Sequence, residues 1–478
     1  MLFNLPRKNA ESTTWFAGLL VTSCCRRLEA SLVGVDGSTI GSRVKTGYGL
    51  SFELPEQIRR DYCETLRPLD GAQRNNRGND NGLSSFGKEA GFPLSPASRN
   101  GLTPRLSTAK RNSLLEIQEE TLRELLTAAN VAPSDLLVIG VQDPGVWFAE
   151  KFSDTEVGSS PGIGDFETSF RELGERKPVF RESLSDTTAL ATRTGYNVLE
   201  AFPTTDLSVG GQGGPLFPLA YWALLHSSER HRLLLDLGQE ARITFLPNSS
   251  SGNKRQIGYG SAGACGSLID PIVQMLTNGE QSFDDGGRLS VQGEQLPELR
   301  ELLTRLGKWD VPSIPSHWSP FAPIFAARQT AALFEQIRLK NWSLRDVLCT
   351  VVESVACRIA RTLRSQFGPI LSDAELIITG GGRRHGILLK TLQRELGCEK
   401  IILLDKLGYV PEQFDASALA MLTALTVNQV PGNLPHLTGA ETDRILGRFI
   451  PGSPQNWQRL VRFMADIKPA VRSLRSAV

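Results

Sequence analysis

The sequence predicts an α/β protein built from two lobes that follow the same plan. Segments with strand patterns alternate with segments of helical periodicity through most of the chain, which is typical of α/β folds. Each half also opens with consecutive strands before its first long helix, near residues 15–54 and 232–246. At 478 residues the chain is long enough for two hydrophobic cores. We therefore expect a first lobe over residues 15–216 and a second over 217–478.

The first lobe is expected to begin after a disordered N-terminus, residues 1–14. Three strands separated by Arg, Gly and Ser turn signals predict a β-meander over 15–54. Residues 70–111 are rich in Asn, Gly, Ser and Pro without periodicity, so we expect a disordered insertion. The other elements expected here are a helix over 55–67, an amphipathic helix over 113–130, a strand over 131–141, an irregular region over 143–180, a helix over 184–194 and a strand over 197–202.

The second lobe shows a clear alternation of elements. Its segments are bounded by glycines and prolines, which mark turns and helix ends. The elements expected are a helix over 217–225, strands over 232–237 and 241–246, a glycine-rich segment GYGSAGACGS, helices through most of 267–365, a strand over 375–379, a helix over 386–396, a strand over 400–404 and a helix over 414–427.

A short apolar segment near the N-terminus has two interpretations. Residues 15–24 read WFAGLLVTSC and follow Arg7 and Lys8, which is the shape of a secretory signal with its cleavage site. A buried first strand has the same pattern. We favour the strand, because Arg26, Arg27 and a second strand follow at once. No other apolar run approaches the ~20 residues of a membrane span.

Charge and cysteine content exclude several classes of protein. The 52 basic and 51 acidic residues give a net charge of +1, so we expect neither a nucleic-acid-binding nor a membrane-surface protein. The seven cysteines form no CxxC pair and no Cys/His array, which argues against structural zinc. An odd, sparse set of cysteines predicts free thiols in a reducing compartment, and hence a cytoplasmic protein.

Three glycine-containing turns are the strongest signals for a ligand site. Residues 210–214 read GGQGG before a helix, where the backbone can approach a ligand and present N–H groups to an anion. Gly380–Gly382 follow a buried strand and precede a helix. Asp236 and Gly238 end another strand, where a phosphate can meet backbone N–H groups and the carboxylate can hold Mg²⁺ through water. A tight turn without a ligand would also need glycine at the first two places.

The order of these motifs resembles one family. Residues 206–225 (DLSVGGQGGPLFPLAYWALL), 376–392 (LIITGGGRRHGILLKTL) and 431–451 (PGNLPHLTGAETDRILGRFIP) are similar to the lobe-crossing loop, the adenosine-binding turn and the C-terminal signature of the anhydro-N-acetylmuramic acid kinases. Apart from 70–111, the resemblance covers roughly residues 15–452. It implies the two-lobed actin-like ATPase fold, which is a duplicated ribonuclease H-like sugar-kinase fold, and a homodimer.

The resemblance also implies a reaction and a site. The family uses ATP, Mg²⁺ and water to phosphorylate 1,6-anhydro-N-acetylmuramic acid, opening its anhydro ring, in the recycling of peptidoglycan amino sugars. The expected partners are therefore a small-molecule sugar and a nucleotide. The residues expected in the site are Asp236, Gly238, Gly380, Gly381, Gly382, Thr22 and Ser23 for the nucleotide, Asp236 for the metal, Gly210, Gly211, Gln212 and Gly213 for the sugar, and Asp206 for catalysis.

Several reactive side chains of the family are replaced in this sequence. Ala201 stands where the family has its catalytic Asp, so the expected general base is missing. Residues 22–27 (TSCCRR) replace a glycine-rich phosphate turn that contains an Asp, and 142–145 and 261–266 also lose polar contacts. Asp236 and Asp415 stand where the family has Asn and Glu, and both substitutions are compatible with the family's function.

Three functions stay open on these grounds. The first is a kinase of the anhydromuramic acid class. The second is a pseudokinase that binds nucleotide or muramyl sugar in a regulatory or scaffold role without turnover. The third is an actin-fold kinase with another acceptor and a relocated base, for which Asp206 and Asp143 are the candidates.

Overall fold

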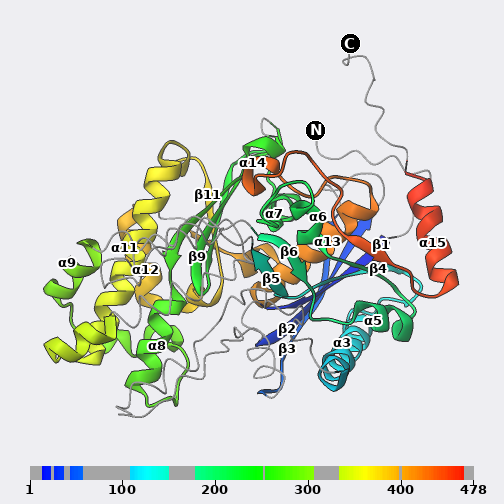
Figure 1. Cartoon of the computed structure of the whole chain (residues 1–478). Coiled ribbons are helices and arrows are strands. Elements are labelled where there is room, and N and C mark those ends of the chain that lie inside the picture. The colour runs from blue at the N-terminus through cyan, green and yellow to red at the C-terminus, as the bar shows by residue number, and fades with distance from the viewer. Residues whose placement is uncertain are drawn as a thin grey trace, which may run out of the picture.

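A computed structural model gives the fold of residues 13–22, 26–36, 44–56, 108–149, 178–250, 253–305, 333–397 and 401–467. Two β-sheets lie side by side, each with helices against it (Figure 1). Residues 1–12 of the N-terminus that we expected to be disordered over 1–14 lie outside the described residues, whereas Thr13 and Thr14 belong to a strand. Residues 57–67 of the expected helix and residues 70–107 of the expected insertion also lie outside the described residues.

The first sheet contains six strands in the order β13-β7-β4-β1-β2-β3. β1, β2 and β3 pair antiparallel, while β4 pairs parallel with β1 and β7 parallel with β4. The strands are β1 (Thr13–Val21), β2 (Arg27–Asp36), β3 (Val44–Glu53), β4 (Leu136–Gln142), β7 (Asn197–Glu200) and β13 (Arg448–Ile450). Residues 15–21 of the apolar segment thus belong to a largely buried strand within a meander, as we favoured.

The second sheet repeats this plan in the order β10-β9-β8-β11-β12. β8, β9 and β10 form an antiparallel meander, and β11 and β12 are added in parallel beside β8. The strands are β8 (Arg232–Leu237), β9 (Glu240–Leu246), β10 (Gly258–Ala264), β11 (Glu375–Thr379) and β12 (Ile401–Leu403). The repeated order, a meander and then two parallel strands beside its first strand, is the duplicated ribonuclease H-like plan of the predicted actin-like fold.

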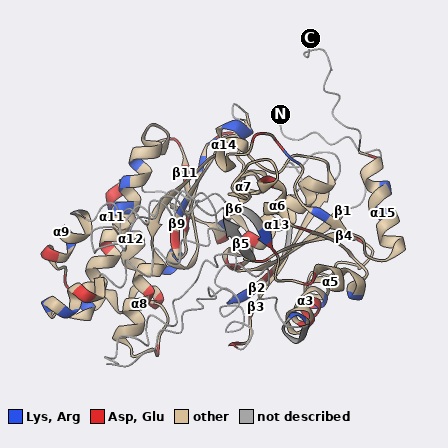
Figure 2. Cartoon of the chain, viewed as in Figure 1, with Lys and Arg blue, Asp and Glu red and all other residues tan. Residues whose placement is uncertain are grey.

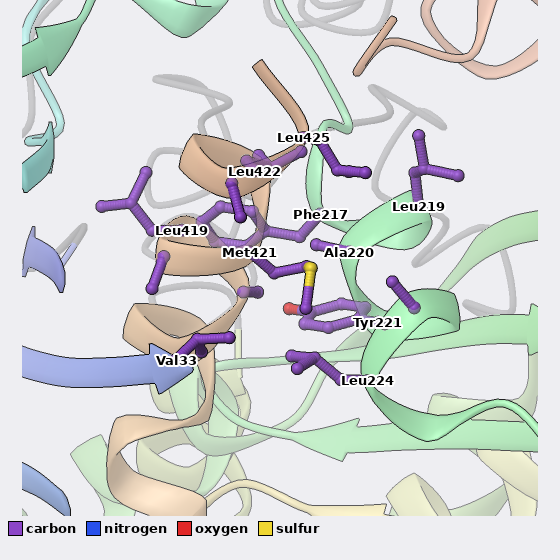
Figure 3. Packing of buried hydrophobic residues seen from close by; sticks show 14 of the residues in the cluster. Val33, Phe217, Leu219, Ala220, Tyr221, Leu224, Leu419, Met421, Leu422 and Leu425 are labelled. Carbon is purple, nitrogen blue, oxygen red and sulfur yellow. The ribbon is translucent and has the colours of Figure 1, made fainter. Parts of the chain in front are cut away.

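Two helices fill the space between the sheets, α7 (Phe217–Leu225) and α13 (Phe414–Val427). α13 contacts β1, β2 and β4 as well as α7. Its backbone lies close to the first sheet, because a Cβ on Gly18 would lie 2.8 Å from the Ala420 nitrogen and one on Gly140 would overlap Thr423. Figure 3 shows side chains of α7 and α13 pointing toward one another. Because α13 is buried on almost every side, its sequence is mostly apolar all round.

The remaining helices cover the outer faces of the sheets. α3 (Thr108–Ala128) and α5 (Thr187–Thr194) pack on the first sheet, and their apolar residues share a core cluster with β1, β2 and β4. In the second half, α8 (Gly266–Leu276), α9 (Pro297–Arg305), α11 (Leu344–Leu371) and α12 (Gly386–Leu396) surround a separate core.

Several predicted boundaries differ from the structure. α3 begins five residues before the predicted helix start at 113, so residues 108–111 belong to this helix and not to an insertion. The glycine-rich segment 258–264 is the third meander strand, which its composition hid because glycine is rare in strands. A hairpin of β5 (Val146–Ala149) and β6 (Pro178–Glu182) occupies part of the region predicted as irregular.

The C-terminal segment returns to the first sheet. β13 pairs antiparallel with β7, and α15 (Pro454–Ala465) contacts β4 and β7. The chain therefore crosses between the sheets more than once, and at least residues 448–465 do not lie with the second lobe to which the sequence prediction assigned them. Such a three-residue strand carries too weak a pattern to be recognised from sequence.

Among the described residues, Lys and Arg positions and Asp and Glu positions are distributed over both halves (Figure 2). Within the part of the chain that the structure describes, every helix is too short or too polar to cross a bilayer.

Candidate active site between the two sheets

Both sheets bring the ends of their parallel strands to one edge. In the first sheet these ends are Val21, Gln142 and Glu200, and in the second they include Leu237 and Thr379. Ligands of open α/β sheets bind outside the carboxyl ends of the strands. The turns that follow these residues carry most of the residues predicted to bind the nucleotide.

At the second sheet, the triple-glycine turn packs against the β8–β9 turn. Gly380 has a φ of 82°, and a Cβ there would lie 2.6 Å from the carbonyl carbon of Leu237 and would collide with Asp236. A Cβ on Gly382 would lie 2.8 Å from that of Leu237. Arg383 holds the turn by donating from Nη1 to the Gly380 carbonyl oxygen at 3.0 Å. The structure thus brings together the predicted nucleotide residues of this lobe.

This packing gives a sharp test with a matched control. We expect Gly380→Ala to destabilise the fold by about 2–4 kcal/mol or to displace the turn, because the new methyl group meets backbone in a left-handed conformation. Gly381→Ala should change stability by less than about 1 kcal/mol, since nothing lies within 4 Å of its Cβ position. Urea unfolding of both variants measures the difference, and equal stabilities would contradict the packing.

Asp236 is held by a cation from its own hairpin. Its Oδ2 accepts from Nε of Arg242 at 3.1 Å and also from Nη2, the two residues being directly opposite in the β8–β9 ladder. Burial opposes the charge of Arg242, but Asp236, Tyr259 and Asp415 outweigh it and raise the pKa of the guanidinium well above its usual value. The predicted metal-associated carboxylate is therefore one half of an ion pair.

Asp415 connects this ion pair to the helices between the sheets. Tyr221 of α7 donates to Oδ1 of Asp415 at 2.7 Å, and its ring stacks on Phe414. Burial first, and then the charge of Asp236, raise the pKa of Asp415, while Arg242 opposes the shift. The β8–β9 hairpin, α7 and α13 thus share one partly buried polar cluster.

Thr22 and Arg26 are the described residues that flank the connection between β1 and β2. Thr22 closes this turn, since its Oγ1 accepts from the Arg27 nitrogen at 3.2 Å; the predicted Ser23 lies outside the described residues. Burial raises the pKa of Asp270 on α8 to about 6, and Gln239 and then Arg26 oppose that shift. Gln239 Nε2 donates to Asp270 at 2.8 Å. The charge of Arg26, in the first half of the molecule, therefore acts on Asp270 in the second half.

Ala201 directly follows β7, at the edge where a catalytic carboxylate is expected. Its backbone is left-handed, with φ 59° and ψ 32°, and it caps α6 (Phe202–Leu207) without a side-chain hydrogen bond. Asp and Asn tolerate this conformation better than other residues with a Cβ, and both are good N-caps. The local backbone therefore suits the carboxylate that the sequence lacks.

Asp206 is buried under the glycine loop, and its oxygens are used by neighbouring groups. Oδ2 accepts from the Gly213 nitrogen at 2.9 Å, and Oδ1 accepts from Asn433 at 2.9 Å and Thr438 at 2.8 Å. The carboxylate has no exposed surface, and a Cβ on Gly211 would overlap it. Asp206 therefore fastens the glycine loop to the C-terminal segment, a role different from the catalytic one that we predicted.

The conformation of the glycine loop (residues 210–214) is stabilised by hydrogen bonds to Asp206 and to the C-terminal segment. Gly210 and Gly213 have positive φ angles of 79° and 78°, and the Gln212 nitrogen donates to the Thr438 carbonyl oxygen at 2.9 Å. Gly211 donates its N–H to the Asp206 carbonyl oxygen. The predicted sugar-binding residues 210–213 thus form one tight turn at the start of the crossing between the sheets.

Asp143, the other carboxylate considered as a base, is also engaged. Arg181 lies 2.7 Å from its Oδ1, and Oδ2 accepts from Ser183, Leu184 and Ser185. Both partners of the ion pair are buried. Burial lowers the pKa of Arg181, and Asp143 opposes that shift. This ion pair joins the residue directly after β4 to β6, and the Asp143 carboxylate does not face solvent.

The sheets and turns define a two-lobed protein of the actin-like class, with its predicted nucleotide residues at the carboxyl ends of strands in two matching sheets. The family model described as anhydro-N-acetylmuramic acid kinase matches residues 167–452, more than half of the chain. The chain belongs to the anhydro-N-acetylmuramic acid kinase family.

Individual relatives agree with this assignment. The anhydro-N-acetylmuramic acid kinase of Nitrosospira multiformis is 29% identical, covering 60% of this chain and 74% of that protein. That of Ralstonia nicotianae is 27% identical, covering 76% and 87%. Among solved structures, the activator of 2-hydroxyisocaproyl-CoA dehydratase from Clostridium difficile with bound ADPNP shares 12% identity at a TM-score of 0.36, covering 85% of this chain and 93% of that one. A score this low carries no functional argument.

Sequence reasoning missed Arg242. A single arginine inside the otherwise apolar strand EARITFL was the available signal. With a three-residue turn over 238–240, hairpin pairing places that arginine opposite Asp236. The donors to Asp206 were not predictable in this way, because Asn433 and Thr438 lie more than 200 residues further along the chain.

Proposed function

We propose that this protein binds ATP and a 1,6-anhydromuramic sugar between its two lobes and transfers phosphate much more slowly than a complete member of its family. Family membership supports the kinase-like class and the two ligands. The observation that carries the slow rate is Ala201, which stands at the end of β7 where the base is expected. Neither Asp206 nor Asp143 replaces that base, because both carboxylates are buried and already accept several hydrogen bonds.

The reaction shows why a base matters. Water adds to the anhydro bridge of the sugar, the oxygen released from the bridge takes the γ-phosphoryl group, and ADP leaves. The attacking water must lose a proton, and a positioned carboxylate taking it contributes about 10²–10⁴-fold in rate. The framework that would hold the nucleotide, at Asp236, Gly238 and Gly380–Gly382, does not depend on that carboxylate.

A pseudokinase is the second candidate function. It is favoured by the same position, since an alanine cannot accept a proton, and by the basic β1–β2 turn TSCCRR. In that case ligand binding would regulate or scaffold another process. We also propose a cytoplasmic location, where ATP is available, and a homodimer, both in keeping with the family resemblance.

Calorimetry of ATP and 1,6-anhydro-N-acetylmuramic acid binding, run beside a coupled assay for ADP release, tests the proposal. We expect both ligands to bind and ADP to appear at a low rate that depends on the sugar. Binding without any sugar-dependent ADP would favour the pseudokinase. Failure of both ligands to bind would contradict the proposal.

A further inference from the structure

Residues 284–290, which lie between α8 and α9, pack against the residue that follows the triple-glycine turn. A Cβ on Gly287 would lie 3.0 Å from Nδ1 of His385. Oδ2 of Asp284 lies 3.3 Å from Nε2 of the same ring. Because His385 directly follows residues 380–384, this contact holds the predicted nucleotide turn at a second place, apart from its packing on the β8–β9 turn.

His385 is buried and is the N-cap of α12. Its Nδ1 accepts a hydrogen bond from the Leu388 nitrogen at 3.3 Å, so the proton of the neutral ring is on Nε2. That nitrogen is the one beside the Asp284 carboxylate. A carboxylate in this position fixes which ring nitrogen carries the proton, and thereby the orientation in which the ring caps the helix.

Asp284 is itself held in place by backbone groups. Its Oδ1 accepts from the Leu289 nitrogen at 2.8 Å, and its Oδ2 accepts from the Ser290 nitrogen at 3.0 Å. Burial raises the pKa of Asp284, but His385, the Leu289 N–H group and Ser290 outweigh burial and lower the pKa to about 2. The carboxylate beside His385 is therefore buried, charged at neutral pH and fixed in position.

The triple-glycine turn leads directly into this cap. The His385 nitrogen donates to the Gly382 carbonyl oxygen at 3.0 Å, and the Arg383 nitrogen donates to the Gly380 carbonyl oxygen at 3.3 Å. Gly380 and Gly382 pack on the β8–β9 turn, whereas His385 packs on residues 284–290. Loss of the histidine contacts would therefore release the helix end of the turn while its strand end stayed in place.

We propose that His385 is a positioning residue for the nucleotide and that Asp284 acts through it. The pair holds the triple-glycine turn in the conformation that receives ATP, and it takes no part in holding the sugar. This inference rests on the proposed binding of ATP between the lobes.

Calorimetric titrations of the full-length protein, with ATP and separately with 1,6-anhydro-N-acetylmuramic acid, test the role of His385. We expect His385→Ala to weaken ATP binding about five- to tenfold, as for the loss of an N-cap, and to leave sugar affinity within about twofold. His385→Asn should bind ATP within about threefold of wild type, because Asn is a good N-cap and can also donate to Asp284.

The possible failures of this test are distinguishable. Wild-type ATP affinity in His385→Ala, an equal loss of both ligands, or no rescue by His385→Asn would overturn the positioning role while leaving ATP binding by the wild-type protein intact. Absence of ATP binding by the wild-type protein would overturn the proposed function and this inference together.

A double-substitution cycle tests whether Asp284 acts through His385. Asp284→Asn keeps the shape of the side chain and removes its charge, so ATP binding should weaken about threefold; most of that loss should disappear when His385 is already Ala. Equal losses in both backgrounds would show that Asp284 acts independently. Asp285→Asn is the matched control, because it neutralises the adjacent, exposed carboxylate and should leave ATP affinity within about twofold of wild type.

Discussion

Ala201→Asp is expected to raise the rate of phosphate transfer to 1,6-anhydro-N-acetylmuramic acid by about 10²–10⁴-fold, the usual contribution of a general base. The backbone at this position is already left-handed and begins α6, a conformation that Asp adopts more readily than Ala. The new carboxylate would stand at the carboxyl end of β7, beside the ends of β1 and β4. The measurement is the turnover number from ADP release with both substrates saturating.

Ala201→Asn is the matched control for that substitution. Both Asp and Asn adopt this left-handed conformation more readily than Ala, so neither substitution should lower the free energy of unfolding by more than about 0.5 kcal/mol. Only Asp can accept the proton from water, so the rate increase should be confined to it. An equal gain in both variants would assign the effect to stability. No gain in either would mean that the replaced β1–β2 turn also limits the reaction.

Asp206→Ala is expected to lower the free energy of unfolding by about 3–5 kcal/mol, because three buried donors lose a charged acceptor. Those donors come from the glycine loop and from the C-terminal segment, namely Gly213, Asn433 and Thr438. Loss of these hydrogen bonds would separate the glycine loop, where the chain begins to cross between the lobes, from the C-terminal segment. Chemical unfolding followed by circular dichroism measures the loss.

An exposed aspartate controls for the loss of one charge. Asp373→Ala removes an exposed carboxylate near the end of α11 and should change stability by less than about 0.5 kcal/mol. The comparison also separates two roles for Asp206. If Asp206→Ala kept wild-type stability and lost all transfer, Asp206 would be a catalytic residue, and our account of it as an anchor would be wrong.

The sequence predicted most regular elements well where local pattern and tertiary role agree. Helices α7, α12 and α13 and strands β8 and β11 match the predicted boundaries, because their apolar runs are bounded by Pro, Gly or capping residues. Strand β10 was hidden by its glycines, and β13 by its length. The duplicated plan was predictable because each half repeats the same meander.

The site was predictable in its framework and less so in its side chains. Glycine clusters mark turns by their backbone requirements, so Gly380–Gly382 and Asp236 could be brought together from sequence. Whether a carboxylate faces solvent or fastens two segments depends on distant donors, which no local pattern reveals. Asp206 was therefore assigned a chemical role although the structure gives it a complete set of partners.

The central claim is that a kinase framework persists here without its base. It is tested most directly by the turnover number of the wild-type protein, measured on a sample whose ATP binding has been shown by calorimetry. Our account predicts a rate about 10²–10⁴-fold below the ~1–100 s⁻¹ typical of kinases. A wild-type turnover within that ordinary range would contradict it.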